Sequence, residues 1–208
     1  EKPNLRTLCA LTHNETKLDL HGRDLGPGDA KLLAPEILVM SSLTSLSLGD
    51  NNLGDDGVEA LSVGLKESKG LATLDLSNKS ILSTKFGPKG AAALASAIAV
   101  MASVTMCDLR NNKLGVEGWA IVFNTLRDST TSKITTWNLS GERLGAGIAK
   151  PLANYISVTA SVTSVMLLAN NFDDATVAML LKLKEEKPTL TTLCGLKTKQ
   201  TEADFRFS

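Results

Sequence analysis

The chain has 208 residues, enough for one large domain or two small ones with a substantial core. Lysine plus arginine number 22 and aspartate plus glutamate also number 22, so no net field attracts nucleic acid or an anionic membrane. A hydrophobic content of 43% argues against wholesale disorder, and the three cysteines are too few for a disulfide framework. Because the sequence also lacks an apolar run long enough to span a bilayer, we expect an intracellular, cytoplasmic protein with no inserted segment.

Three predicted units of similar pattern occupy the first half of the chain. Their ranges are 16–42, 43–70 and 71–103. Each opens with apolar residues that alternate with small polar ones, as Leu46 and Leu48 do in "LTSLSL", which is typical of a short strand with one buried face. The apolar spacing then changes to i, i+3, i+7, which predicts a helix, and Pro27 and Pro88 after glycine mark two helix starts. The third unit carries about five extra residues near "SILST" (80–84) by comparison with its neighbours.

Three further units repeat this pattern. Their ranges are 104–133, 134–161 and 162–189. Asp173 and Asp174 mark the start of the last helix, because acidic side chains suit the positive end of the helix dipole. Cys107 and Trp137 occupy the strand position that leucine holds elsewhere, and Trp119 occupies an inward helix position. We therefore expect all three in the core, with Cys107 as a buried, reduced thiol.

The repeat resembles a known family. Equivalent strand positions recur at intervals of 28 to 33 residues, and they are Leu18, Leu46, Leu74, Cys107, Trp137, Val165 and Leu193. This pattern resembles the leucine-rich repeat, specifically the long, helix-containing type of ribonuclease inhibitor. The resemblance implies that residues 1–208 form a single α/β solenoid domain, a curved horseshoe segment whose parallel sheet lines the concave face and whose helices cover the convex face.

In this family an asparagine after the strand typically bonds backbone groups of the turn. The position is occupied by Asn51, Asn112 and Asn170 in alternate units, and by Arg23, Lys79 and Glu142 in the others. We therefore do not expect a continuous ladder of asparagines.

The two ends of the chain match each other. The opening "EKPNLRTLCAL" recurs as "EKPTLTTLCGL" from Glu186, an offset of 185 residues. The links near 5–15 and 190–201 are too short for a strand, a helix and both turns. The match predicts that the chain is a slice of a longer array, ending with Phe205 and Phe207 on an exposed strand edge. We expect such a slice to associate end to end, because a solenoid end exposes an unpaired strand and apolar core surface.

Side chains that alternate with the inward residues should line the concave sheet face. The candidate protein-binding residues are Met106, Met166, Leu168, Asp75, Asp108 and Arg110 on this face, with Ile81 and Leu82 on the extra loop. Methionine is adaptable and enriched at contact surfaces, so the apolar trio is the preferred binding patch. Arg110 is expected to pair with Asp108. Ile81 and Leu82 either tuck under the loop, which is the favoured interpretation, or offer an apolar contact.

Catalytic and metal chemistry find little support in the sequence. Asp19, His21 and Ser47 are the residue types of a hydrolase triad and can lie on neighbouring strands, but no feature supplies an oxyanion site. Two histidines without a close cysteine–histidine spacing do not predict a metal site. Phosphate-binding glycine motifs do not occur either, so we expect no metal and no cofactor.

The leading hypothesis is a non-catalytic protein–protein interaction scaffold. Resemblance to ribonuclease inhibitor and to NOD-like receptors implies that the partner is another protein, which would dock on the sheet face or on the extra loop. The alternative is regulation of an enzyme such as a small GTPase, because the Ran GTPase-activating protein has the same repeat type. A hydrolase is the remote third interpretation.

Overall fold

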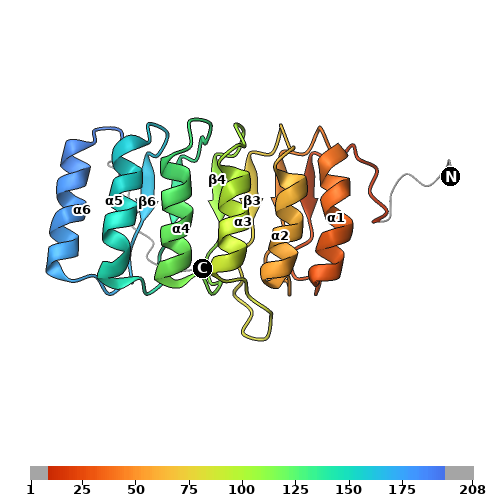
Figure 1. The fold of residues 1–208 in the computed structure, drawn as a ribbon, viewed down its shortest axis with the longest axis horizontal. Helices are drawn as coiled ribbons and strands as arrows, with labels where there is room; N and C mark the ends of the chain where they lie inside the picture. The colour runs from red at the N-terminus through yellow and green to blue at the C-terminus, as the bar shows by residue number, and fades with distance from the viewer. Residues whose placement is uncertain (1–8, 195–208) are drawn as a thin grey trace, which may run out of the picture.

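The computed structural model describes residues 9–194. Six strands in these residues form one parallel sheet in the order β1-β2-β3-β4-β5-β6, and each strand is followed by an α-helix. Figure 1 shows the helices side by side in chain order in one layer, with the strands in a second layer behind them. The predicted α/β solenoid is confirmed, with the sheet on one face and the helices on the other.

The strands are short and the helices span two to four turns. The strands are β1 (Lys17–Asp19), β2 (Ser45–Ser47), β3 (Thr73–Asp75), β4 (Met106–Asp108), β5 (Thr136–Asn138) and β6 (Ser164–Met166). The helices are α1 (Pro27–Val39), α2 (Gly54–Leu65), α3 (Pro88–Ile98), α4 (Gly115–Arg127), α5 (Ala149–Val158, preceded by the 3-10 turn η1, Gly145–Ile148) and α6 (Asp174–Glu186). The helix starts predicted at Pro27 and Pro88 are confirmed, and the Asp173 side chain caps α6 by accepting the Thr176 N–H at 2.9 Å.

The core lies between the sheet and the helices. The central residue of every strand is at most 8% exposed. The prediction that these residues face the core is therefore confirmed. The largest core side chains form an aromatic cluster, which we define as Trp119, Phe123, Trp137 and Tyr155. Ring centroids in the cluster lie 5.4–6.5 Å apart, within the usual range for aromatic pairs. The expectation that both tryptophans serve the core is confirmed.

The turns after the strands are stabilised by asparagine side chains that donate hydrogen bonds to backbone carbonyl groups. Asn51 donates to the carbonyls of Leu20 and Leu48, both at 2.9 Å, and Asn170 repeats the arrangement in the last unit. Between them Asn78, one residue before Lys79, donates to the Asn51 carbonyl at 2.9 Å. The asparagines of alternate units are therefore supplemented by other side chains and do not form one uniform ladder.

Glu142 takes a different role at the same repeat position. One carboxylate oxygen accepts the Asn111 N–H at 2.7 Å, and the other accepts the Trp119 indole N–H at 3.1 Å. Burial raises the pKa of the Glu142 carboxyl above its ordinary value, although both hydrogen bonds oppose the shift. This carboxylate therefore joins the turns of two units to the edge of the aromatic cluster.

The raised pKa of Glu142 predicts a pH-dependent effect of Glu142→Gln. The folded state holds the Glu142 proton more tightly than the unfolded chain does, so wild-type stability falls as pH rises from the unfolded pKa through the folded one. A glutamine side chain is neutral throughout, and the variant should therefore gain stability relative to wild type as pH increases from about 4.3 to 7. Urea titrations across this range measure the difference, and parallel pH profiles for the two proteins would contradict it.

The thiols differ in accessibility. Cys107 is 4% exposed, whereas Cys194 is exposed and Cys9 is half-buried. Burial, reinforced by the charges of Asp108 and Asp75, raises the pKa of the Cys107 thiol well above its ordinary value. In the folded protein we expect a thiol reagent to label Cys194 first and Cys107 only on unfolding, as followed by mass spectrometry. Rapid modification of Cys107 in a Cys194→Ser variant under native conditions would contradict this prediction, because it would show that the Cys107 thiol is accessible to solvent.

The ends of the described region contain no helix outside the six repeats. Residues 9–15 form neither helix nor strand, and Thr192 makes a parallel bridge to Ser164 while Cys194 bridges Met166 in the antiparallel sense. The predictions for Phe205 and Phe207, and for the first eight residues, lie outside the described residues. Among helices of the described region, none is long and apolar enough to cross a bilayer.

Candidate protein-binding face

The surface opposite the helices, which we call the sheet face, is lined by the two outer residues of each strand. One row consists of Lys17, Ser45, Thr73, Met106, Thr136 and Ser164, which pair in register across the sheet. The other row consists of Asp19, Ser47, Asp75, Asp108, Asn138 and Met166. These rows follow the predicted columns because neighbouring strands pair without a slip.

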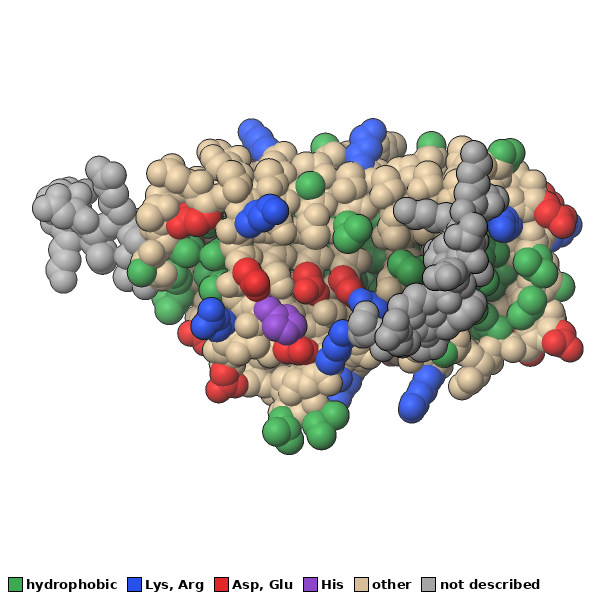
Figure 2. Space-filling view, turned by 180° about the vertical axis from the view of Figure 1, so that it is seen from behind, with side chains coloured by type: hydrophobic (Ala, Val, Ile, Leu, Met, Phe, Trp, Pro, Cys, Tyr) green, Lys and Arg blue, Asp and Glu red, His purple; other side chains and the backbone are tan. Residues whose placement is uncertain are grey.

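Acidic side chains gather on the part of the sheet face that Figure 2 shows in colour. The carboxylates of Asp19, Asp75 and Asp108 each accept the backbone N–H two residues further on, at 2.9–3.1 Å. Asn138 makes the same bond at 3.1 Å to the N–H of Ser140. Such local bonds form Asx turns, and they occur where β1, β3, β4 and β5 leave the sheet. Asp19, Asp75 and Asp108, which we call the acidic row, therefore have a structural role in ending their strands. Asp75 also accepts the Ser47 hydroxyl at 3.2 Å, and Asp108 accepts the Arg110 guanidinium.

Arg110 is held by Asp108. Its guanidinium donates to both carboxylate oxygens at 2.8–3.1 Å, and the two side chains are only 20% and 24% exposed. The hydrogen bonds to Asp108 raise the pKa of Arg110. The predicted pairing is confirmed, and it leaves Arg110 poorly placed to reach a partner's active site as a free cation.

The predicted apolar trio is divided between β4 and the β6 segment, which are not neighbouring strands. Met106 on β4 is 49% exposed, whereas Met166 on β6 and Leu168 beyond it are half-buried. β5 lies between β4 and β6, so two strand spacings, roughly 10 Å, separate these two strands. Met166 is also two residues further along its strand than Ser164, which is in register with Met106 through Thr136. Of the trio, Met106 offers the most apolar surface to a partner.

The extra loop of the third unit projects from the edge of the molecule between β3 and α3 (Figure 1). Ile81 is 93% exposed and Leu82 is 91% exposed. The favoured prediction that these side chains tuck under the loop is wrong. The loop is held at its two ends by hydrogen bonds to the preceding unit, which leaves its tip beyond the reach of the core. Figure 2 shows hydrophobic side chains at this projecting edge, on the same view as the acidic row.

The residues of the candidate triad do not assemble. The Ser47 hydroxyl donates to Asp75 at 3.2 Å, and the His21 ring nitrogen Nε2 lies 3.3 Å from Asp50. Within the described residues, no hydrogen bond joins Ser47 to His21, so the nucleophile–base contact of a triad is not formed. The same part of the chain contains no group of three His, Cys, Asp or Glu residues arranged to hold a metal.

Sequence reasoning missed Gly49, which makes room for the His21 ring. A Cβ atom at Gly49 would lie 2.8 Å from His21 Nδ1 and 3.0 Å from the Ser77 carbonyl oxygen. The other units carry a side chain at this repeat position, so the glycine was the feature of the sequence that could have indicated a close contact here. Sequence reasoning also missed the hollow beside the extra loop, whose lining residues come from three different units.

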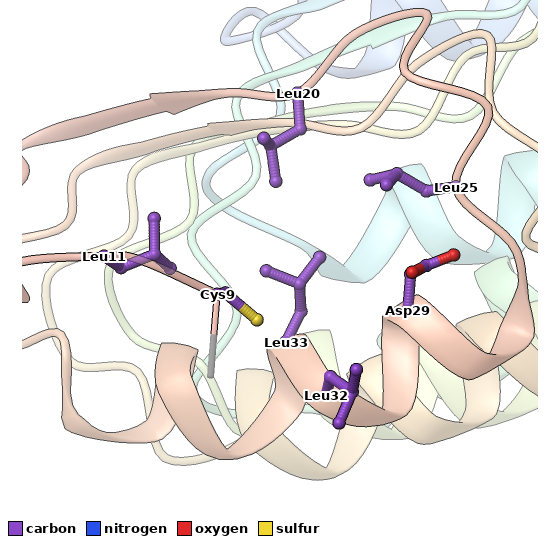
Figure 3. Close-up of a pocket in the computed structure, with 7 residues that line it drawn as sticks. All are labelled: Cys9, Leu11, Leu20, Leu25, Asp29, Leu32 and Leu33. Atoms are coloured by element: carbon purple, nitrogen blue, oxygen red, sulfur yellow. The ribbon is translucent and has the colours of Figure 1, made fainter. Parts of the chain in front are cut away.

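A second hollow lies at the N-terminal end of the described sheet. It has a volume of about 260 Å³ and is lined by Cys9, Leu11, Leu20, Leu25, Asp29, Leu32 and Leu33. Figure 3 shows these side chains coming from α1, from the turn after β1 and from the segment before β1. Its lining is mainly apolar, as expected for the end of a repeat stack.

Comparison with known sequences supports the family that the repeated fold indicates. Residues 39–62, which include β2 and the first part of α2, match the family described as Leucine Rich repeat. This match falls on one of six stacked strand–helix units with a regular period. The chain is a leucine-rich repeat protein. Its 28% identity to mouse ribonuclease inhibitor over 79% of the chain places it with the ribonuclease-inhibitor-like type.

The relatives are much longer than this leucine-rich repeat chain. It is 31% identical over 183 residues to human NACHT, LRR and PYD domains-containing protein 13, covering 86% of this chain and 17% of the relative. It is 28% identical over 165 residues to mouse ribonuclease inhibitor, covering 79% of this chain and 35% of the relative. Mouse Tonsoku-like protein is 27% identical over 91% of this chain and 14% of its own length. The chain thus spans about a third or less of these relatives, which together support a protein-interaction scaffold in general terms.

Proposed function

We propose that this leucine-rich repeat chain is a non-catalytic scaffold that binds another protein through its sheet face and extra loop. The observation that carries the proposal is the exposure of Ile81 and Leu82, each above 90%, on a loop fixed by hydrogen bonds. Adjacent exposed apolar side chains form contiguous apolar surface, the kind of surface that marks interaction sites, in contrast to single scattered residues. Met106 supplies a further apolar contact, and the acidic row supplies polar ones. The name of the mouse relative, ribonuclease inhibitor, supports a protein as the target.

Affinity selection tests the proposal. The chain is immobilised, incubated with cell extract and cross-linked, and captured proteins are purified and titrated individually by calorimetry. For a genuine partner, Met106→Ser or the double change Ile81→Ser, Leu82→Ser should weaken binding by about tenfold or more, which corresponds to about 1.4 kcal/mol.

Val63→Ser is the matched control, because Val63 is 67% exposed on α2 and lies on the helical face. It should leave the affinity unchanged. The proposal fails if every purified partner binds the Met106 and loop variants as tightly as wild type, or if Val63→Ser alone removes binding. Acceleration of GTP hydrolysis by a small GTPase would instead establish the enzyme-regulator alternative.

End-to-end self-association remains a further prediction. The apolar hollow at the N-terminal end and the exposed Val177, Met179 and Leu181 of α6 supply apolar surface at opposite ends of the described stack. We expect the mass measured by sedimentation to rise with concentration, and Leu32→Glu to suppress this rise by placing a charge at the hollow. Val100→Glu, in the middle of the stack, is the control. A constant monomer mass for wild type at high concentration would refute the prediction.

A further inference from the structure

We propose that the extra loop and the hollow at its base form a docking point for a protein segment that carries a lysine or arginine beside an apolar residue. This inference rests on the proposed scaffold function and names the chemistry of the partner. The extra loop is residues 80–84, and the hollow is lined by Gly22, Asp24, Asp50, Asn52, Ser80, Leu82 and Ser83.

The extra loop is held in one position. At its start, the Asp50 carboxylate accepts the backbone N–H groups of Lys79 and Ser80, the latter at 3.1 Å. At its end, the Thr84 N–H donates to the Asn52 side chain at 2.8 Å, and the Thr84 carbonyl accepts the Gly54 N–H at 3.2 Å. A loop ordered before binding loses little conformational freedom when a partner docks, which favours affinity.

The tip of the loop presents apolar surface that the described part of the protein does not cover. Ile81 and Leu82 are adjacent and almost fully exposed. Leu82 also forms one wall of the hollow, so the apolar tip and the hollow are parts of one surface. A partner that covered Leu82 would therefore meet a residue that also lines the hollow.

The hollow has the size of a side chain and the charge of a cation-binding site. Its volume is about 250 Å³, below the range of about 300–1,000 Å³ typical of small-molecule pockets. Asp24 and Asp50 bring two carboxylates to its lining, and Asn52 adds an amide. Among the described residues, no lysine or arginine lines it, so the lining has a negative formal charge at neutral pH.

The carboxylate of Asp24 is available to a partner. One of its oxygens accepts a hydrogen bond from the Asn52 side chain, and within the described region nothing donates to the other. The Asp50 carboxylate already has several partners within the protein. It accepts backbone N–H groups of the loop and lies 3.3 Å from His21 Nε2. The neighbouring Arg23 and Lys79 side chains form no ion pair with any described residue. Asp24 is therefore the expected primary contact of an incoming cation.

These features fit one kind of occupant. The head of a lysine or arginine would meet Asp24, and its aliphatic stem would run along Leu82, since such side chains bury their stems against apolar surface. The apolar residue beside it would cover Ile81. An anionic membrane would be attracted by neither carboxylate, which is why we choose a protein segment over a lipid surface.

Selection from a phage-displayed library of random peptides tests this inference with the full chain. We expect enriched peptides to contain a lysine or arginine next to an aliphatic or aromatic residue. For a synthetic peptide of that type, replacing its basic residue by glutamine should weaken binding by about tenfold. Asp24→Asn should weaken peptide binding by a similar factor and reduce the salt dependence of binding. The double change Ile81→Ser, Leu82→Ser should also weaken peptide binding by about tenfold or more.

Val63→Ser again serves as the control and should bind the peptide like wild type, while circular dichroism confirms that all variants fold. Enrichment of acidic peptides, peptide binding that is insensitive to both loop and Asp24 variants, or no enrichment would overturn the inference. Loop-dependent binding to vesicles of phosphatidylcholine and phosphatidylserine without peptide binding would overturn it in favour of a membrane.

The two proposals can fail separately. If a captured cellular protein depends on Met106 but not on the extra loop, the scaffold function stands and the docking point is wrong. If no cellular protein is captured but basic peptides bind through Asp24 and the loop tip, the docking point stands while the scaffold function lacks support.

Discussion

Replacement of Trp137 by alanine is expected to lower the free energy of unfolding by about 3–5 kcal/mol. Trp137 is fully buried at the centre of β5, and its ring lies 5.6 Å from Phe123 and 5.9 Å from Trp119. Truncation removes the transfer free energy of a large apolar side chain and leaves a cavity, because the rings on α4 and α5 cannot collapse fully into the space. A urea titration followed by circular dichroism measures the loss.

A polar contribution adds to this effect. The Trp137 indole N–H donates to the Tyr155 hydroxyl at 3.3 Å inside the core. Burial raises the pKa of Tyr155, so the hydroxyl stays neutral and needs a partner. Trp137→Phe should therefore cost less than the alanine change but still destabilise, since it keeps an aromatic ring while removing the donor.

Thr136→Ala provides the control on the same strand. Thr136 precedes Trp137, and its side chain lies on the sheet face. We expect a change within about 0.5 kcal/mol, as is usual for surface substitutions. Equal costs for the two alanine variants would mean that the two faces of β5 have been assigned in reverse.

The fold was predictable because the repeat constrains the same positions several times. Cys107 and Trp137 do not look like leucines, yet the interval between units places both at strand centres, and both are buried. A single strand of three residues would carry too little pattern to be assigned alone. Six copies in register compensate for the weakness of each one.

The details of the candidate site were less predictable because they depend on contacts outside the repeat. The extra loop occurs in one unit, so no period indicates where Ile81 and Leu82 point; the hydrogen bonds to Asp50 and Asn52 decide it. The role of Glu142 is similarly hidden, since its Trp119 partner lies on the helix of the preceding unit. Such cross-unit pairs are set by three-dimensional packing and not by local sequence.

Gly64→Ala is expected to destabilise the protein by about 2 kcal/mol, even though alanine is the better helix former. Gly64 is buried in α2, and a Cβ atom there would overlap the carbonyl oxygen of Ala34 in α1 and lie 2.9 Å from its carbonyl carbon. That neighbour is backbone and cannot rotate away, so the two helices would have to separate. Overpacking of this kind costs typically about 1–3 kcal/mol, and the backbone overlap places Gly64 at the upper end of this range. About 2 kcal/mol therefore remains after the gain of about 1 kcal/mol in helix propensity.

Gly28→Ala separates this packing effect from helix propensity. Gly28 lies near the start of α1, where an added Cβ would meet nothing within 4 Å among the described residues. The substitution should therefore leave stability unchanged or raise it by up to about 1 kcal/mol, because alanine restricts the unfolded chain. Thermal and urea unfolding of the two variants give the comparison directly. If Gly64→Ala also proved neutral or stabilising, the close approach of α1 and α2 at Gly64 would not contribute to the stability of the solenoid, and the spacing of these helices would have to be set by other residues.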